Sequence, residues 1–268
     1  MTKAALQQPR VVSRTEWLAA RTEHLKKEKE LTRLTDELSR QRRDLPWVKV
    51  DEDYAFDTPA GRKTLSDLFE GCSQLIDYHF MFGPGRKEGC VGCSFTKDHM
   101  DGAVVHLEHH DVSFVAASRA PLAELAAYQK RMGWHFKWFS SFGSDFNYDY
   151  HVSVRPEDIA KGEVEYNFGK YPAQAEEMSG VSVFYKTPSG DIFHTYSTYA
   201  RGGEKMLGTY MLLDMTPKGR NENGPHYGLT DWVRHHDNYD GGGHVERTGR
   251  YVAPATKESG CHCEQRPA

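Results

Sequence analysis

The first forty residues carry the spacing of one long, mostly polar helix. Ser13 and Glu16 form the S-x-x-E pattern of a capping box at its start, and Pro46 ends it. A thin apolar stripe runs through the Lys, Glu and Arg residues, at Leu25, Leu31, Leu34 and Leu38. The stripe is too narrow and short for a coiled coil, so we predict a solvated helix over residues 13–43. Its apolar face would lie on the protein body or on a second subunit.

From Tyr54 onward the chain becomes aromatic and alternates between strand and helix patterns. YAF and KTL flank DTPAG, which predicts a hairpin, and SDLFEG predicts a short helix after it. Residues 75–82, LIDYHFMF, form an almost continuous apolar run that is typical of a central strand buried on both faces. A glycine-rich loop then leads into a C-x-x-C and a helix over residues 94–111.

The second half of this region repeats the unit and then changes to antiparallel patterns. Residues 112–118 predict a strand, Pro121 and Gly133 bound a helix, and FKWFSSF predicts a third strand. VSVFYK and DIFHTYSTYA, joined by TPSG, predict a hairpin, and residues 204–214 a final helix. Two strand–helix units followed by a hairpin and a helix predict an α/β protein of thioredoxin-like, peroxiredoxin-like fold. Its central mixed sheet would be flanked by helices and preceded by the long N-terminal helix.

These patterns divide the chain into three parts. We predict an N-terminal helical extension over residues 1–50, a thioredoxin-like domain over 51–239 and a flexible C-terminal tail over 240–268. The tail begins at three consecutive glycines and carries no periodicity.

Charge and hydropathy argue against two kinds of partner. Lys and Arg total 34 and Asp and Glu total 38, for a formal charge of −4, so no basic field attracts nucleic acid or anionic lipid. No apolar run approaches the roughly 20 residues that span a bilayer, and the start of the sequence lacks the apolar segment of a signal peptide. We therefore expect a cytoplasmic protein that binds neither nucleic acid nor membranes.

The five cysteines do not form a disulfide scaffold in a chain of this length. Cys72 stands alone, Cys90 and Cys93 form the C-x-x-C, and Cys261 and Cys263 form a C-x-C in the tail. Only the C-x-x-C lies where a predicted strand ends and a predicted helix begins. We expect the tail cysteines to be dispensable.

The position of the C-x-x-C favours dithiol chemistry. The unpaired N–H groups and positive dipole end of a helix stabilise a thiolate, so Cys90 is predicted to be the nucleophile. Cys93 lies one turn further on and is predicted to resolve a mixed disulfide on Cys90. Lys97 and His99 would support the pair with positive charge or a proton, or would be ordinary residues on the helix surface. This interpretation needs no cofactor and predicts a thiol or disulfide partner, either a small molecule or a protein.

Two other functions remain open from these residues. Cys90 and Cys93 with His99, or with a histidine among His106, His109 and His110, could instead bind copper or zinc. The third hypothesis is a noncatalytic interaction domain that forms a homodimer through its N-terminal helix.

Other motifs are weaker. Asp145, Asn147 and Asp149 resemble the start of a calcium loop, but Tyr150 stands where such a loop needs glycine. The chain has no G-x-S-x-G elbow and no phosphate-binding G-x-x-x-x-G-K-[ST]. The aromatic loop around Phe146 and Tyr148 and the strand HTYSTYARG are predicted substrate contacts near the dithiol.

Several of these stretches together resemble a known family. LIDYHFMFGPGRKEGCVGCSF, VSFVAASRAPL, FKWFSSFGSDFNYD and VSVFYKTPSGDIFHTYSTYARG are similar to thioredoxin-like proteins catalogued under a domain of unknown function and described as predicted dithiol-disulfide oxidoreductases. The resemblance covers roughly residues 12–239. It implies a redox role for Cys90 and Cys93 and leaves the substrate undefined.

Two positions depart from the relatives of that family. Thioredoxins carry a proline directly before the strand that faces the C-x-x-C, where it helps to align the backbone of a partner, and here Ser179 and Gly180 stand there. Peroxiredoxins carry a Thr three residues before the peroxidatic Cys, and here Lys87 stands three residues before Cys90. These departures argue against binding of protein disulfides and against efficient peroxide reduction.

Overall fold

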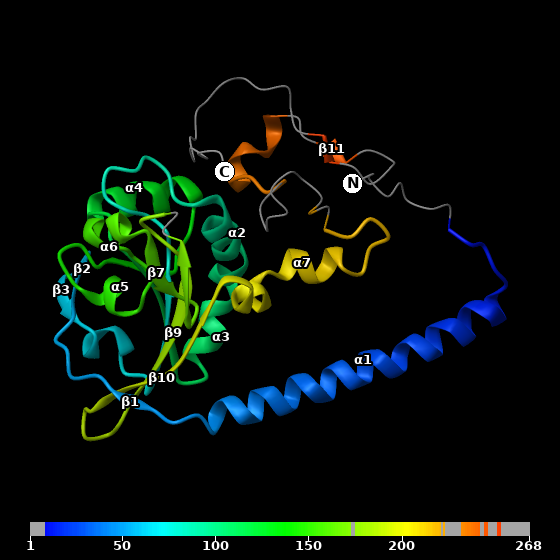
Figure 1. The fold of residues 1–268 in the computed structure, drawn as a ribbon, viewed down its shortest axis with the longest axis horizontal. Helices are drawn as coiled ribbons and strands as arrows, with labels where there is room; N and C mark the ends of the chain where they lie inside the picture. Colours follow the sequence, from blue (N-terminus) through cyan, green and yellow to red (C-terminus); the bar gives the residue numbers. More distant parts are fainter. Residues whose placement is uncertain are drawn as a thin grey trace.

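The computed structural model describes residues 9–172, 175–220, 222, 232–241, 244–245 and 251–252. Its centre is an eight-stranded sheet with the order β1-β10-β9-β4-β5-β6-β2-β3 (Figure 1). The strands are β1 (Val48–Lys49), β2 (Ala55–Thr58), β3 (Gly61–Thr64), β4 (Gln74–His79), β5 (Val112–Ser118), β6 (Lys137–Ser140), β9 (Gly180–Lys186) and β10 (Ile192–Tyr199).

The connections within this sheet are those of a thioredoxin-like fold. β4, β5 and β6 are parallel neighbours, and helices α2 (Val91–Met100) and α4 (Leu122–Met132) lie in the connections between them. β9 pairs antiparallel with β4 on one side and with β10 on the other, and α7 (Gly208–Leu213) follows. This confirms the predicted fold class: a mixed sheet flanked by helices, with a long N-terminal helix.

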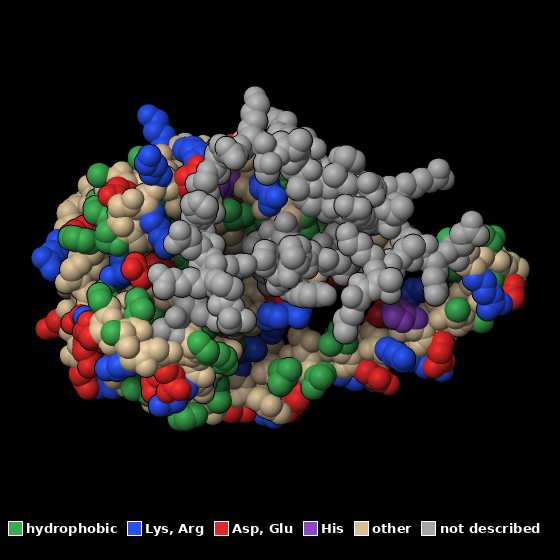
Figure 2. Space-filling view, turned by 45° about the horizontal axis from the view of Figure 1, so that its top comes forward, with side chains coloured by type: hydrophobic (Ala, Val, Ile, Leu, Met, Phe, Trp, Pro, Cys, Tyr) green, Lys and Arg blue, Asp and Glu red, His purple; other side chains and the backbone are tan. Residues whose placement is uncertain are grey.

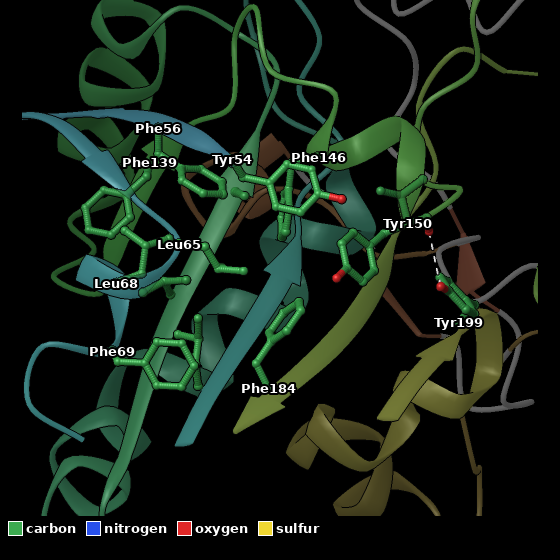
Figure 3. Packing of buried hydrophobic residues seen from close by; sticks show 14 residues of the cluster. Tyr54, Phe56, Leu65, Leu68, Phe69, Phe139, Phe146, Tyr150, Phe184 and Tyr199 are labelled. Atoms are coloured by element: carbon green, nitrogen blue, oxygen red, sulfur yellow. Dashed lines mark hydrogen bonds between the residues drawn. The ribbon is translucent and has the colours of Figure 1, made fainter. Parts of the chain in front are cut away.

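Alternation along the strands gives the sheet two apolar faces. On one face, Leu75, Phe184 and Phe146 belong to a cluster that includes the predicted hairpin of β2 and β3 (Figure 3). On the other face, the strand residues of opposite parity form a second cluster with α2 and α4. Trp138 of β6, Phe80 after β4 and Tyr128 of α4 belong to this cluster. The cysteine pair lies on this second face.

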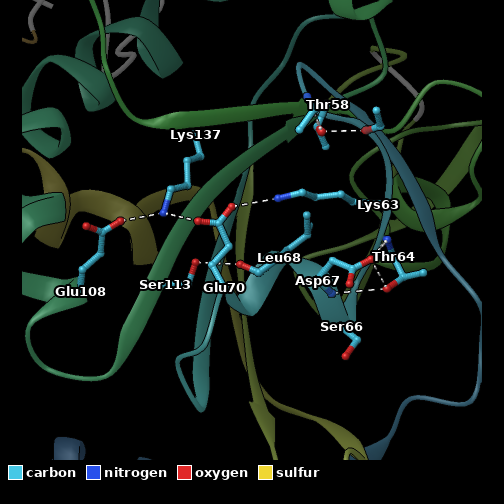
Figure 4. Close-up of polar contacts among 12 residues, drawn as sticks. Thr58, Lys63, Thr64, Ser66, Asp67, Leu68, Glu70, Glu108, Ser113 and Lys137 are labelled. Atoms are coloured by element: carbon cyan, nitrogen blue, oxygen red, sulfur yellow. Dashed lines mark hydrogen bonds and ion pairs between the residues drawn. The ribbon is translucent and has the colours of Figure 1, made fainter.

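An ion-pair network lies beside the first apolar cluster, where the short 3-10 helix η1 (Ser66–Phe69) ends. Glu70 accepts from Lys137 at 2.7 Å and from Lys63 at 3.1 Å, and Lys137 also reaches Glu108 at 2.7 Å (Figure 4). The buried hydroxyl of Ser113 on β5 donates to the carbonyl of Leu68 at 2.8 Å. These bonds tie η1 to β5 and β6.

The N-terminal helix α1 (Arg14–Arg43) extends away from the sheet (Figure 1). The predicted capping box is present, since Ser13 accepts from the Glu16 N–H and Glu16 accepts from the Ser13 N–H. No residue of α1 is buried, and its surface shows apolar side chains between charged ones (Figure 2). Homodimer formation through this helix stays a prediction.

Two predicted helices are wrong in extent. The helix expected over residues 94–111 divides into α2, the 3-10 turn η2 (Asp101–Ala103) and α3 (Val104–Glu108). The Asp101 carboxylate accepts the N–H groups of His135 and Phe136, and Gly102 follows it, which disfavours a continuous helix. The helix expected over 204–214 likewise divides at Leu207 into η3 (Ala200–Met206) and α7, with Gly202 and Gly203 in the 3-10 part.

The sequence patterns did not predict several short elements. They are α5 (Phe146–Asp149), α6 (Pro156–Lys161), β7 (Glu163–Tyr166), β8 (Gly169–Pro172), η4 (His236–Gly241), β11 (His244–Val245) and β12 (Tyr251–Val252).

The predicted tail falls mainly outside the described residues, and so do Cys261 and Cys263. The domain boundaries stay predictions. None of the helices in the described part of the chain is long and apolar enough to cross a membrane.

Gly89, directly before the C-x-x-C, gives a test of this packing. A Cβ atom at Gly89 would lie 2.6 Å from the Phe80 ring and 3.0 Å from the Tyr128 ring. We expect Gly89→Ala to lower the free energy of unfolding by about 1–3 kcal/mol, because both rings are buried and cannot give way freely. Gly102→Ala is the matched control, since a Cβ there meets nothing within 4 Å. Equal denaturant midpoints for the two variants would contradict the described packing.

Candidate functional site

The cysteine pair is held where β4 leads, through a loop of residues 82–89, into α2. Cys90 is the N-cap residue of α2, and its N–H donates to the Met81 carbonyl at 3.2 Å. The Met81 N–H in turn lies 3.5 Å from the Cys93 sulfur. One residue at the end of the strand therefore contacts both cysteines and fixes their position relative to the sheet.

The start of the helix is fixed from its other side as well. The Cys90 carbonyl accepts the N–H of Ser94 at 2.9 Å and the Ser94 hydroxyl at 2.8 Å. That hydroxyl also lies 3.0 Å from the Tyr128 hydroxyl on α4. The backbone of Cys90 is thus bound to β4 and, through Ser94, to α4. All three described cysteines, Cys72, Cys90 and Cys93, are free thiols.

Hydrogen bonding lowers the pKa of Cys90 to about 6. The largest cause is a hydrogen bond from the Cys93 thiol, and burial of the sulfur opposes it. The backbone N–H groups of Cys93 and Gly92 and the positive charge of Arg86 lower the pKa further. The direction agrees with the sequence prediction, but the main cause is the second thiol rather than the helix N-terminus.

Cys93 has the opposite character. Its side chain is buried, and burial together with the negative charge of Cys90 raises its pKa well above the ordinary value. At neutral pH the pair therefore contains one thiolate, on the more exposed sulfur, and one protonated thiol behind it. The lower pKa thus falls on Cys90, the residue that the sequence analysis predicts to be the nucleophile.

Lys97 lies one helical turn beyond Cys93 and is completely buried, so its interpretation as a helix-surface residue is wrong. Its Nζ lies 3.6 Å from the ring centre of Tyr78 and 4.3 Å from that of Phe114, and it has no hydrogen-bond partner. Burial lowers its pKa well below the ordinary value, while the negative charges of Cys93 and Asp77 act in the other direction. A buried amine thus lies near Cys93.

Asp77, whose carboxyl acts on Lys97, belongs to a set of buried polar residues that the sequence did not predict. Burial raises the pKa of Asp77 to about 8 and lowers that of His79 to about 3. The His79 Nε2 lies 2.8 Å from Ser182, which continues at 2.9 Å to Ser197 and from there at 2.7 Å to His194. Asp77 and His79 alternate with Tyr78 along β4, and His79 and His194 contact rings of the first apolar cluster, away from the cysteines.

His99, the other predicted supporting residue, is not brought to the pair. Its Nδ1 donates to the Phe95 carbonyl at 2.6 Å, and its Nε2 accepts the Thr209 N–H at 3.0 Å. Both ring nitrogens are therefore occupied, Nδ1 within α2 and Nε2 in the contact between α2 and α7. The structure does not bring His99 together with Cys90 and Cys93, as the alternative metal set would require. Within the described residues, no group of three or more His, Cys, Asp and Glu side chains could hold a metal ion.

The sequence also missed a segment that holds the cysteine loop. His235 is buried, and its Nε2 lies 3.0 Å from the Gly89 carbonyl, one residue before Cys90. Arg131 on α4 forms ion pairs with both Glu88 and Asp237. Residues 232–241 therefore bind the loop that precedes Cys90. A pair of histidines after a tryptophan carries no signal that would have predicted this contact.

A cavity of about 390 Å³ opens beside the pair. Cys90, Cys93 and Tyr78 form one wall, and residues from the end of β10 and from η3 form the other, including Thr198, Tyr199 and Arg201. The HTYSTYARG strand thus lies beside the dithiol as predicted. The prediction for Phe146 is wrong, because this ring is buried in the cluster on the other face of the sheet.

Fold and site together define a thioredoxin-like protein that carries a cysteine pair at the first turn of its central helix. The chain belongs to the family described as "Bacterial protein of unknown function (DUF899)", whose model matches residues 6–239. This confirms the family resemblance found in the sequence. No curated protein matches the chain.

Solved structures of similar fold are distant in sequence. Peroxidoxin BcpB from Mycobacterium tuberculosis is 14% identical with a TM-score of 0.39, over 62% of this chain and 95% of that one. A PrxQ mutant from Xylella fastidiosa is 11% identical with a TM-score of 0.39, over 62% and 94%. The bacterioferritin comigratory protein of Xanthomonas campestris is 11% identical with a TM-score of 0.40, over 63% and 96%. At these values the likeness bears on neither residue roles nor substrates.

The hydrogen bond from Cys93 to Cys90 can be tested by alkylation. We expect the rate of Cys90 alkylation by iodoacetamide to rise through a midpoint near pH 6, because only the thiolate reacts and its pKa is about 6. Cys93→Ala removes the donor and should move the midpoint upward, whereas Cys93→Ser keeps a hydroxyl donor and should keep it low. A midpoint at or above about 8.5 in the wild-type protein, the value of an ordinary thiol, would contradict the assignment.

Proposed function

We propose that this protein is a thiol–disulfide oxidoreductase in which Cys90 is the attacking thiolate and Cys93 the resolving thiol. The observation that carries the proposal is the opposite displacement of two pKa values within one C-x-x-C whose cysteines both line a cavity, with the lower pKa on the less buried cysteine. A merely structural pair of buried cysteines has no reason to keep one thiolate at neutral pH.

The reaction then has two exchange steps. The Cys90 thiolate attacks one sulfur of a disulfide R–S–S–R, which forms a mixed disulfide and releases one thiolate RS⁻. Cys93 then loses its proton and attacks the Cys90 sulfur. The second RS⁻ leaves, and an intramolecular disulfide joins Cys90 and Cys93. The protein is oxidised by two electrons, the substrate is reduced to two thiols, and a dithiol reductant returns the protein to its starting state.

In this scheme the second step needs a base, because the Cys93 pKa is raised by burial. Lys97 is the proposed base. It is a buried amine with a lowered pKa, one turn from Cys93, and it has no hydrogen-bond partner to give up. The ammonium that forms on proton transfer would rest against the faces of Tyr78 and Phe114 and near the Asp77 carboxyl. The proton then passes to the departing RS⁻.

The proposed dithiol cycle predicts a reversible disulfide. On mild oxidation we expect mass spectrometry to find one intramolecular bond between Cys90 and Cys93, which a dithiol reductant removes. Cys93→Ser should instead trap a mixed disulfide on Cys90, because the resolving sulfur is missing. Stoichiometric copper or zinc that is lost on replacement of either cysteine, with no trapped species, would favour the metal hypothesis and overturn this one.

The role of Lys97 predicts a selective defect. The neutral disulfide 2,2′-dithiodipyridine releases one coloured thione when Cys90 attacks and a second one when Cys93 resolves the mixed disulfide. In Lys97→Met, which keeps an unbranched side chain in the apolar site, we expect the second release to slow by a factor on the order of 10². Its pH profile should move to higher pH.

The first release should keep the wild-type rate in Lys97→Met. Lys130→Met on α4 is the control for loss of a lysine charge, and it should change neither phase. If Lys97→Met slows both phases equally, or neither, Lys97 is only a packing residue.

A further inference from the structure

The cavity beside Cys90 is small. Its volume of about 390 Å³ lies near the lower end of the roughly 300–1,000 Å³ range of small-molecule sites. The segment η3 covers it opposite the cysteines, with Gly203 and Met206 in its wall. A substrate sulfur that enters this space meets Cys90 in the cavity wall.

The neighbouring strand offers no free backbone to a polypeptide. At the start of β9, Gly180 is paired with His79 of β4 on one side and with Tyr199 of β10 on the other. Docking of a peptide as an added strand needs an unpaired edge. At Gly180 both edges are occupied by strands of the same chain.

The residue before Gly180 is also engaged. The Tyr166 hydroxyl donates to the Ser179 carbonyl at 2.8 Å and accepts the Ala200 N–H at 3.2 Å. The tyrosine thus bridges the start of β9 to the start of η3, at the place where the thioredoxin pattern would put its proline. Space for a partner's backbone is closed further by Tyr199, whose ring would lie 2.6 Å from a Cβ at Gly180.

The side chains inside the cavity are mainly uncharged. Val181, Met206 and Leu207 contribute apolar surface, and the Thr96 hydroxyl is already bound to the Gly92 carbonyl at 3.0 Å. Among the lining charges, Arg201 and Glu204 bind each other at 2.6 Å, Glu204 also binds Arg220 at 3.2 Å, and Glu222 adds a second carboxylate to the wall. A substrate that enters meets apolar surface, an ion pair that is already formed and carboxylates that repel an anion.

We infer that the site acts on small, uncharged organic disulfides rather than on disulfides of folded or extended polypeptides. This inference rests on the proposed dithiol function and specifies its substrate class. One half of the disulfide occupies the cavity, and the scissile sulfur receives the Cys90 thiolate. Resolution by Cys93 releases the second thiol, so the two exchange steps balance as they do for any disulfide R–S–S–R.

Single-turnover exchange tests this substrate class. Reduced protein is mixed with hydroxyethyl disulfide, with the dianionic 3,3′-dithiodipropionate, or with insulin, and formation of the Cys90–Cys93 disulfide is followed by mass spectrometry. We expect hydroxyethyl disulfide to react fastest, and the dianion and insulin each to react slower by a factor on the order of ten or more.

Filling the cavity gives the structural arm of the test. A Cβ at Gly203 meets only the flexible end of Met206, at 3.4 Å, so larger side chains fit there without backbone strain. Gly203→Ala and Gly203→Leu should slow exchange with hydroxyethyl disulfide progressively, by about tenfold or more for Leu. Gly102→Leu, in open space, should leave it unchanged, and thermal unfolding of all three variants checks that they fold.

The outcomes separate this inference from the proposed function. If no disulfide of any kind oxidises the pair, the oxidoreductase function itself fails. If the pair cycles but insulin reacts as fast as hydroxyethyl disulfide, or Gly203→Leu has the rate of Gly102→Leu, the function stands and the small-molecule substrate class is overturned.

Discussion

The site depends on the two hydrogen-bonding groups of Met81. Its carbonyl holds the Cys90 N–H and its own N–H approaches the Cys93 sulfur, so the end of β4 is bound to both ends of the C-x-x-C. Every other contact of the loop builds on this link. Gly89 permits the close approach to Phe80, and His235 fixes the Gly89 carbonyl. Without the Met81 contacts, the start of α2 would lose its direct bonds to the segment that follows β4.

Burial and hydrogen bonding shift the pKa values of chemically similar groups in opposite directions. Two thiols three residues apart acquire opposite pKa displacements because one receives hydrogen bonds while the other supplies one and loses its solvent. The same desolvation lowers the pKa of Lys97 and raises that of Asp77, on opposite sides of β4. Desolvation by the apolar packing on both faces of the sheet therefore sets the protonation states of the buried groups near the cysteines.

Much of the fold was predictable, because it depends on local patterns. β5 agrees residue for residue with the predicted strand, and α4 ends at Gly133 in the left-handed conformation that the sequence indicated. Cys90 and Cys93 were identifiable because motif and element boundary coincide. Which face a residue occupies was not predictable, as the burial of Phe146 behind the sheet demonstrates. The setting of Lys97 needs rings from β4, from β5 and from the residue before β6, and the His235 contact joins residues 146 positions apart.

The hydrogen bonds to Cys90 have a consequence for the direction of electron flow. They stabilise a negative charge that exists only in the dithiol state, since a sulfur in a disulfide is uncharged and accepts hydrogen bonds weakly. Whatever favours the thiolate therefore favours the reduced protein and raises the reduction potential of the pair, as in strongly oxidising C-x-x-C proteins. Desolvation of the Cys90 anion works against this effect. The balance between the donors and the apolar wall of the cavity thus decides whether the pair tends to take electrons from thiols or to give them to disulfides.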